Sequence, residues 1–467
     1  MTGSAEGRAA SGATRGSAIK LTAELLGRGM SLVTFLLLAR SLGVADYGAF
    51  TTLSVWAVML AESGELGIQG LASQALVTRE LSLGAMVRAK ALAAVLGLVC
   101  GLLSVLVSRT LGILILFFLL AGWSEFAGVA LRARGRATSE AWVILCLRAS
   151  GLAFVGGFLL SGRLSLEGVG WAHVASTLPA LALGAWLLRG EMEDAPIAVD
   201  APIAVLRRSA PLAVNGGLAL VSLRVELLAL ERLRGAHAAG IFGVALRVVE
   251  FLSMVPSAIA GGAMPGLARE ANSESDAVRR RTAWSVALLA GAASLGLAIV
   301  APGVVRLVGG DEFLAASQPM RLLALAVVPL FANVLLSSAL VAAGRPDRLP
   351  RLTALRVGIA LILALVLAPR FGPMGAAAGF LVSEVVLLVV ALRACRDVRF
   401  PVAVAVPFGA GVGLAVPMAI AVSLLGENLA VQIGGGIVTW ALTLTVAWAF
   451  MRRSARNLDR ADESAGP

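Results

Sequence analysis

Two stretches of the chain share one pattern and decide its fold. The first reads LLLARSLGVADYGAFTTLSVW at residues 36–56, and the second reads LALERLRGAHAAGIFGVALRV at residues 228–248, which is 192 residues later. Each contains Arg-x-x-Gly followed by Gly-x-Phe. The matched pairs are Arg40 and Arg232, Gly43 and Gly235, Gly48 and Gly240, and Phe50 and Phe242. Matches in one order at a constant spacing predict an internal duplication.

The duplication continues along the chain. Further pairs, at offsets of 209, 208 and 207 residues, are Gly135-Arg136 with Gly344-Arg345, Arg148 with Arg356, and Arg163 and Gly168 with Arg370 and Gly375. A change of offset from 192 to near 208 indicates a net insertion in the later half. The two halves are therefore expected to be repeats of one structural unit.

The composition excludes an ordinary soluble protein. Hydrophobic residues make up 58% of the chain, charged residues only 14%, and the mean hydropathy is +0.90. Soluble domains are about 45–50% apolar and about 25% charged. So few charges cannot cover a water-exposed surface, and the chain is predicted to be an all-α polytopic membrane protein.

A spanning helix needs about 20 mostly apolar residues. Fourteen segments meet this requirement: 18–40, 45–67, 85–107, 111–131, 139–161, 166–188, 209–231, 238–262, 283–305, 317–342, 351–370, 373–393, 402–424 and 430–451. A shift of six spans keeps the orientation, so we expect two parallel six-helix repeats and two added C-terminal helices. Rocking of two such lobes about a central cleft is typical of transporters.

The organisation predicted from these segments has six parts. They are a disordered cytoplasmic arm (1–17), a first lobe (18–190), a cytoplasmic linker (191–208), a second lobe (209–395), helices 13 and 14 (402–451) and a cytoplasmic tail (452–467). The linker contains two copies of DAPIAV, and the arm is rich in Gly, Ala and Ser without the apolar core of a signal peptide.

The distribution of basic residues predicts the topology. With the N-terminus in the cytoplasm, cytoplasmic connections and tails hold 26 of the 39 Lys and Arg, and opposite connections hold 7. The positive-inside rule therefore places both termini in the cytoplasm. Because the basic residues lie in clusters between apolar runs, they indicate contact with lipid headgroups rather than with nucleic acid.

Several function classes lack their signature. The chain has two lysines and no GxxxxGK[ST] loop, so it carries no nucleotide-binding motor of that type. The outer connections are short, which disfavours an enzyme with carboxylates in a large outer loop. Three cysteines without CxxC spacing and two histidines predict neither a metal site nor a disulfide framework. We expect no catalytic residues and no cofactor.

Charged side chains inside the spans are the candidate functional residues, because such residues usually face a cavity or a partner. Glu24 and Arg28 are four residues apart and share one helix face. In the first span of the second repeat, Arg224 and Glu226 are two residues apart, or about 200° of rotation, and cannot share a face.

Two interpretations of these charges stay open. In the first, pairs such as Glu24–Arg28 and Arg247–Glu250 neutralise each other and hold helices together. In the second, a cationic cleft binds phosphate or pyrophosphate through forked guanidinium groups. The candidate pyrophosphate ligands are Arg28, Arg224, Arg247, Arg148 and Arg356. Arg356 alternatively extends to the cytoplasmic headgroups.

Carboxyl groups inside the spans are candidates for coupling transport to an ion gradient of H⁺ or Na⁺. In order of preference they are Glu226, Glu24 and Glu125. Burial favours the neutral form of a carboxyl group and a nearby arginine favours the charged form, so the sequence leaves the direction at each site open.

Four segments resemble one family of membrane proteins. They are residues 36–56 followed by ESGELGIQG at 62–70, residues 224–270, LVAAGRPDRLPRL at 340–352, and APRFGPMGAAAGFLVSE at 368–384. Together they resemble the O-antigen and exopolysaccharide flippases, the polysaccharide-transporter branch of the multidrug/oligosaccharidyl-lipid/polysaccharide exporter superfamily. Arg224 matches an arginine of the family, whereas Glu226 and Phe242 stand where an aspartate and a tyrosine are usual.

The resemblance implies a V-shaped fold of two lobes that moves an undecaprenyl-pyrophosphate-linked oligosaccharide from the inner to the outer leaflet of the bacterial cytoplasmic membrane. It implies alternating access driven by an ion gradient, and partners comprising membrane lipids, a polysaccharide polymerase and glycosyltransferases. A multidrug or cation antiporter of the same superfamily and a peptidoglycan-precursor (lipid II) flippase are the alternatives. The single tyrosine and the six arginines within spans disfavour the antiporter.

Overall fold

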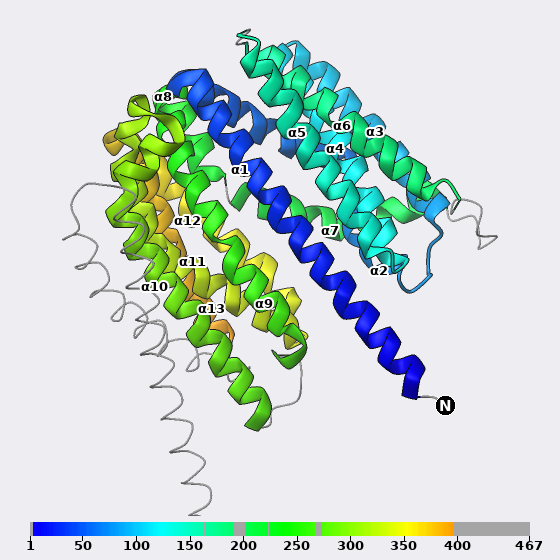
Figure 1. Cartoon of the computed structure of the whole chain (residues 1–467). Coiled ribbons are helices and arrows are strands. Elements are labelled where there is room, and N and C mark those ends of the chain that lie inside the picture. Colours follow the sequence, from blue (N-terminus) through cyan, green and yellow to red (C-terminus); the bar gives the residue numbers. More distant parts are fainter. Residues whose placement is uncertain (1–2, 163–164, 191–200, 223, 268–272, 397–467) are drawn as a thin grey trace, which may run out of the picture. The chain divides into compact units, whose positions relative to one another are not determined.

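The structure is a computed structural model that describes residues 3–162, 165–190, 201–222, 224–267 and 273–396 (Figure 1). Regular elements in these ranges are all helices, and ten segments are long and apolar enough to cross a membrane. The predicted class, an all-α polytopic membrane protein, is confirmed. The number of 14 spans stays a prediction, because spans 402–424 and 430–451 and the tail 452–467 lie outside the described residues.

The chain divides into two compact units, Met1–Arg224 and Val225–Pro467. Unit 1 contains α1 (Gly3–Ala61), η1 (Glu62–Gly64), α2 (Ile68–Ala75), α3 (Leu83–Val105), α4 (Arg109–Ala133), α5 (Ala137–Leu160), α6 (Leu166–Leu188) and α7 (Pro202–Ser222). Unit 2 contains α8 (Val225–Leu252), α9 (Met254–Leu267), α10 (Ser273–Gly309), η2 (Asp311–Ala316), α11 (Ser317–Ala342), η3 (Pro346–Arg348), α12 (Leu349–Phe371) and α13 (Pro373–Ala394).

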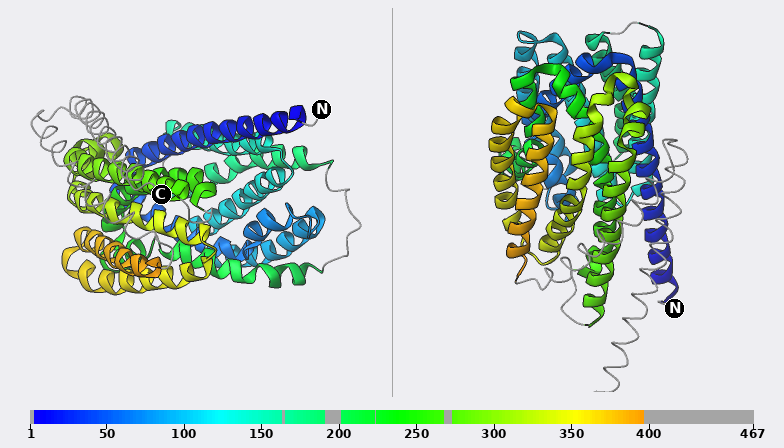
Figure 2. Two further views of the ribbon diagram at one scale, coloured as in Figure 1. Left: turned by 90° about the horizontal axis from the view of Figure 1, so that it is seen from below. Right: turned by 90° about the vertical axis from the view of Figure 1, so that its left-hand side faces the viewer.

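Each unit is built by helices that pack both against neighbours in sequence and against more distant helices. In unit 1, α1 packs against α5, and α4 packs against α6. In unit 2, α12 and α13 run side by side and α13 also packs against α11 (Figure 2). The short connection between α12 and α13 explains their pairing, because a connection of a few residues places the next helix beside the previous one.

A glycine kink marks the same place in both repeats. Gly43 interrupts α1 with φ 73° and ψ 174°, and Gly235 interrupts α8 with φ 80° and ψ 176°. This backbone region is essentially restricted to glycine, because a Cβ atom there clashes with the backbone. Gly43 falls between the predicted spans 18–40 and 45–67, and Gly235 falls between the predicted spans 209–231 and 238–262. The shared kink at an offset of 192 residues supports the duplication.

The helix after the first kink ends within a predicted span. Span 45–67 was expected to continue to Gly67, but α1 ends at Ala61 and is followed by η1 and a left-handed Gly67 with φ 73°. A Cβ atom at Gly67 would lie 2.5 Å from the main-chain nitrogen of Ala213 in α7. The absence of a side chain therefore lets α7 approach the break between α1 and α2.

Two further helices differ from the predicted boundaries. Helix α1 starts at Gly3, inside the stretch 1–17 that was expected to be a disordered arm, and alanine-rich sequence has high helix propensity. Helix α7 starts at Pro202, inside the stretch 191–208 that was expected to be a linker. Proline suits the first turn of a helix, because the missing amide hydrogen has no partner there.

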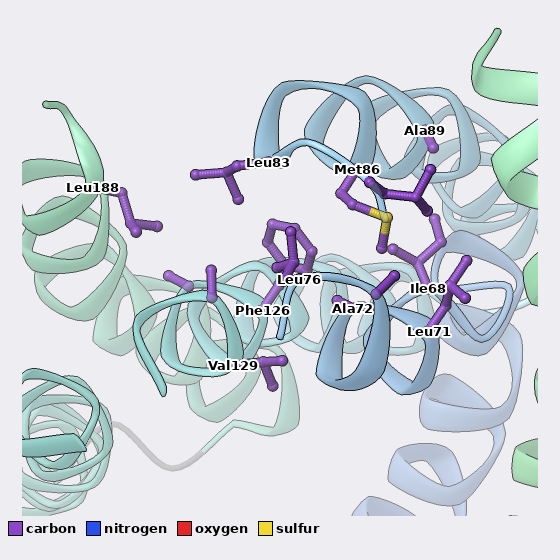
Figure 3. Packing of buried hydrophobic residues seen from close by; sticks show 14 of the residues in the cluster. Ile68, Leu71, Ala72, Leu76, Leu83, Met86, Ala89, Phe126, Val129 and Leu188 are labelled. Carbon is purple, nitrogen blue, oxygen red and sulfur yellow. The ribbon is translucent and has the colours of Figure 1, made fainter. Parts of the chain in front are cut away.

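One hydrophobic core of unit 1 lies largely between α2, α3 and α4, and a second one joins α1, α4, α5 and α6. Figure 3 shows Ile68 and Leu71 of α2 packed against Met86 of α3, and Phe126 of α4 beside Leu76. Burying each such side chain contributes about 1.5–3 kcal/mol where it is removed from water. The first of these cores fixes the helices that hold Lys90 and Glu125.

Candidate functional site

The ionisable groups inside the candidate spans form three clusters, of which the first lies on α1 and α5. Glu24 and Arg28 on α1 share one face, as their spacing predicts, with Arg28 Nη2 3.8 Å from Glu24 Oε2. Both side chains are partly exposed, at 36% for Glu24 and 44% for Arg28. A pair this open is weakly held, so the guanidinium group of Arg28 is available to an anionic ligand.

Arg148 joins this cluster from α5. Its Cγ atom would lie 3.2 Å from a Cβ atom at Gly27, so the side chain of Arg148 crosses α1 where a glycine leaves room. Arg148 is exposed in the structure. Gly27 directly precedes Arg28, and the fold therefore brings two predicted phosphate ligands, Arg28 and Arg148, to neighbouring positions on packed helices.

The second cluster surrounds Lys90 at the break after α1. Lys90 on α3 is 1% exposed, forms an ion pair with Glu65 and lies 5.3 Å from the ring centre of Trp123. Lys90 falls inside the predicted span 85–107, and the structure buries it within α3. The Glu65 carboxylate compensates the charge of the ammonium group, which explains how the lysine is accommodated there.

Glu125, a predicted coupling residue, lies at the edge of the second cluster. The Gln69 side chain on α2 donates a hydrogen bond of 3.3 Å to Glu125 on α4. Glu125 is exposed. Glu62 and Glu65 each interact electrostatically with Glu125, with Lys90 and with each other. The cluster thus joins four elements around the interruption between α1 and α2.

The third cluster is the most deeply buried and lies in unit 2. Arg356 on α12 donates hydrogen bonds to Glu384 on α13, at 2.6 Å, and to Glu226 on α8, at 3.4 Å. Side-chain exposure is 4% for Arg356, 0% for Glu226 and 2% for Glu384. Arg356 also stacks 4.9 Å from the ring centre of Phe380. This arginine therefore lies in the interior of unit 2, held by two carboxylates.

Asn333 on α11 completes the third cluster. Its Nδ2 atom donates to the Glu384 side chain at 2.8 Å and to the Glu384 main-chain oxygen at 3.0 Å. Its Oδ1 atom has no hydrogen-bond partner within the described residues, although the residue is 5% exposed. When all are ionised, Glu226, Glu384 and Arg356 together carry one net negative charge. A cation or proton entering this cluster would neutralise it.

The remaining candidates lie apart from these clusters. Arg247 and Glu250 on α8 form an ion pair of 3.1 Å, as their spacing predicts, and the Arg247 side chain is 46% exposed. Arg224 is half-buried in the turn between α7 and α8, where its main-chain nitrogen bonds to the Val221 oxygen. Arg224 and Glu226 are not on one helix face, because the helix is interrupted between Ser222 and Val225.

Sequence reasoning did not select Lys90, Glu65 or Asn333 as site residues. One signal was present: Lys90 is one of only two lysines among 39 basic residues, and it follows the start of an apolar run by several residues. Asn333 had no comparable signal. Its role depends on the packing of α11 against α13, which spacing along the chain does not reveal.

Solved structures with a similar fold are flippases and multidrug transporters. A structure named "Lipid II flippase MurJ, inward closed conformation" has a TM-score of 0.75 and 12% identity, covering 93% of this chain and 99% of its own. A multidrug resistance MATE family transporter of the MOP superfamily has a TM-score of 0.62 in its inward-facing conformation, with 14% identity and coverage of 83% and 98%. In its outward-facing conformation the TM-score is 0.58 and the identity is 16%, and the match covers 83% of this chain and 96% of the transporter.

No curated protein matches the chain. A family model described as "Polysaccharide biosynthesis protein" matches residues 13–270, which is more than half of the 467 residues. The matched region includes all of unit 1 beyond its first residues and the start of unit 2. The chain therefore belongs to the polysaccharide biosynthesis protein family, as its resemblance to polysaccharide transporters predicted. Its multi-pass membrane fold is similar to those of the flippase and transporter structures.

Proposed function

We propose that the protein is a flippase that moves undecaprenyl-pyrophosphate-linked oligosaccharide units from the inner to the outer leaflet of the bacterial cytoplasmic membrane. Membership of the polysaccharide biosynthesis family carries this proposal. The similarity of the fold to a flippase for a lipid-linked substrate supports it. Both termini lie in the cytoplasm according to the distribution of Lys and Arg.

The pyrophosphate requires cationic side chains along its path. Moving one bare charge through hydrocarbon costs on the order of tens of kcal/mol in the Born limit, and a pyrophosphate carries about two charges. Arg28 and Arg148 lie at neighbouring positions on packed helices in unit 1, while Arg224 and Arg247 supply further guanidinium groups. Several partly exposed arginines bind the headgroup at moderate strength, which permits release.

Arg356 has a different role from these four arginines. Because Glu226 and Glu384 surround it in the interior of unit 2, it positions the carboxylates rather than binding the headgroup. Uptake of H⁺ or Na⁺ at Glu226 would remove the excess negative charge of the cluster and loosen the contact of α8 with α12. Such a contact can couple an ion gradient to the alternating movement, with Glu24 and Glu125 as weaker candidates.

One alternative has structural support of its own. The similar fold of the lipid II flippase makes a peptidoglycan precursor a second candidate substrate. It shares the polyprenyl-pyrophosphate chemistry, so the same arginines would serve. The multidrug antiporter reading rests on the MATE similarity, which is lower in TM-score. A polysaccharide polymerase and glycosyltransferases are the partners that a polysaccharide substrate would require.

Transport in proteoliposomes tests the proposal directly. The substrate is a fluorescent polyprenyl-pyrophosphate oligosaccharide, and the signal is its exposure to a membrane-impermeant quencher. We expect Arg28→Ala with Arg148→Ala to lose most of the transport and Arg28→Lys to retain part of it. Arg306→Ala is the matched control, because Arg306 is exposed and pairs only with exposed Asp311 among the described residues.

Two outcomes would reject parts of the proposal. Transport of the oligosaccharide at the wild-type rate by the Arg28 and Arg148 double variant would remove these residues from the site. Accumulation of peptidoglycan precursor instead of undecaprenyl-linked polysaccharide units in a deletion strain would favour the lipid II alternative. Imposing a proton gradient or a sodium gradient across the vesicles separates the two coupling ions, and Glu226→Gln should abolish the dependence on the effective gradient.

A further inference from the structure

A pocket of about 470 Å³ lies at one end of unit 2. Its lining consists of Arg348, Arg351, Leu352, Arg393, Ala394 and Arg396. Four of these six residues are arginines and none is acidic. The volume falls within the range of about 300–1,000 Å³ that is typical of pockets for small ligands. It is therefore large enough for a headgroup with more than one phosphate.

The pocket lies at the level of a membrane surface. Arg348 and Arg351 belong to the start of the candidate span Pro346–Phe371, and Arg393 belongs to the end of the candidate span Pro373–Ala394. The ends of spanning helices are where lipid phosphates lie. Basic pockets between spanning helices at this level bind anionic lipid headgroups in other membrane proteins.

One of the four arginines, Arg348, has a structural role that the other three do not share. The side chain of Arg348 donates a hydrogen bond to the main-chain oxygen of Ala394, which ties the start of α12 to the end of α13. Arg351, Arg393 and Arg396 form none of the ion pairs found among the described residues. Asp347 is adjacent in sequence but does not line the pocket.

The equivalent end of unit 1 shows which side chains occupy this location when the arginines have partners within the protein. At the offset of 208 residues Arg351 corresponds to Val143, and at the offset of 207 residues Arg393 corresponds to Trp186. Glu140 forms a 3.2 Å ion pair with Arg132. Valine and tryptophan in unit 1 thus stand where unit 2 has Arg351 and Arg393.

The other arginines at this end of unit 1 also have internal partners. Arg136 donates a 3.0 Å hydrogen bond to the main-chain oxygen of Leu187, which resembles the bond from Arg348 to Ala394. The guanidinium group of Arg189 lies 5.2 Å from the ring centre of Trp186. Unit 1 therefore neutralises or stacks its arginines, whereas unit 2 gathers four arginines around a cavity.

We propose that the pocket binds the phosphate groups of a lipid headgroup. Guanidinium groups from two helices can each form two hydrogen bonds to a phosphate, which gives a strong and oriented contact. An anionic phospholipid of the bilayer and a polyprenyl pyrophosphate both present this chemistry. Binding of the bilayer lipid does not depend on the proposed function, whereas binding of the polyprenyl pyrophosphate rests on it.

Native mass spectrometry of the full chain in detergent tests the proposal, with cardiolipin and undecaprenyl pyrophosphate as separate probes. The test variant combines Arg351→Gln, Arg393→Gln and Arg396→Gln. We expect about fivefold weaker binding for each arginine removed and about 100-fold for the three together. The control combines Arg207→Gln, Arg280→Gln and Arg281→Gln, which removes the same charge from exposed positions outside this pocket.

A second variant keeps the test decisive if the triple variant unfolds. Arg351→Val with Arg393→Trp copies the side chains of unit 1, and thermal unfolding in detergent checks that it is folded. Loss of cardiolipin binding alone identifies a bilayer lipid, and loss of undecaprenyl pyrophosphate binding identifies the transported class of lipid. Binding of both probes at wild-type affinity by a folded variant, or an equal loss in the control, overturns the proposal.

Discussion

Arg148 and Arg356 occupy the same position in the two repeats and have opposite environments. Arg148 is exposed on α5 and its stem passes Gly27. Arg356 is 4% exposed on α12 and is held by Glu226 and Glu384. The helix position is shared, but only unit 2 provides the carboxylates. A duplicated backbone has therefore produced one arginine that can reach a ligand and one that organises a core.

The difference follows from the neighbouring helices. At the repeat offsets of 192 and 207 residues, Glu226 corresponds to Thr34 and Glu384 to Thr177. Threonine cannot neutralise a guanidinium group, so burial of Arg148 in unit 1 would leave a charge without compensation. Exposure of Arg148 is the consequence. Under the proposed function, unit 1 would bind the headgroup and unit 2 would couple transport to an ion.

The largest expected effect is the loss of Arg356. Arg356→Ala leaves Glu226 and Glu384 buried without their guanidinium partner, and breaking such a network costs about 3–5 kcal/mol. We expect the free energy of unfolding in detergent to fall by that amount. Denaturant unfolding of the purified variant, followed by circular dichroism, measures it.

A compensating variant checks that the cost comes from charge. Arg356→Met combined with Glu226→Gln and Glu384→Gln removes all three charges, and replacement of a buried ionic network by neutral groups is often neutral for stability. Stability should return to near the wild-type value while ion-coupled transport stays lost. A triple variant as unstable as Arg356→Ala would show that packing of Arg356 on Phe380, rather than charge, holds the cluster.

Hydropathy and glycine positions predicted most of the fold. Lipid requires long apolar runs, so the spans are visible in the sequence. The repeated Arg-x-x-Gly motifs at Gly43 and Gly235 predicted the duplication, although not the kinks themselves. The interruption at Glu62–Gly67 was not predicted, although its sequence ESGELG, with two glutamates and two glycines, departs from the apolar run before it.

The clusters could be predicted only where their partners are near in sequence. The spacing of Glu24 and Arg28 indicates the pair directly. Arg356 and Glu226 are 130 residues apart, and no spacing rule connects them. Contacts between helices depend on which faces pack together, and a single sequence with amphipathic signals this weak leaves those faces undetermined.

The second largest effect tests whether the two repeats share their backbone. Gly43→Ala and Gly235→Ala each place a Cβ atom in a backbone region that is essentially restricted to glycine. Each substitution should lower the free energy of unfolding by about 1–3 kcal/mol. Denaturant unfolding of both variants should give equal costs, because the two φ and ψ pairs are nearly the same.

A matched pair of glycines serves as the control for this comparison. Gly151→Ala and Gly358→Ala lie within helices α5 and α12, and a Cβ atom at either position meets nothing within 4 Å. Alanine there should stabilise the protein slightly, by about 0.4–1 kcal/mol. A large cost at Gly43 with none at Gly235 would contradict the equivalence of the two kinks and weaken the comparison of Arg148 with Arg356.

The smallest expected effect on stability is at Arg148 itself. Arg148→Gln removes an exposed charge, and exposed substitutions usually change the free energy of unfolding by less than about 0.5 kcal/mol. Transport should nevertheless fall, because the headgroup loses one guanidinium group. Gly27→Val should also lower transport, since its side chain would meet the Arg148 stem at 3.2 Å and displace it. Unfolding in detergent and transport in proteoliposomes separate the two effects. A loss of stability at Arg148 as large as that at Arg356 would mean that both repeats use this arginine to hold their helices together, and the division of roles between them would be wrong.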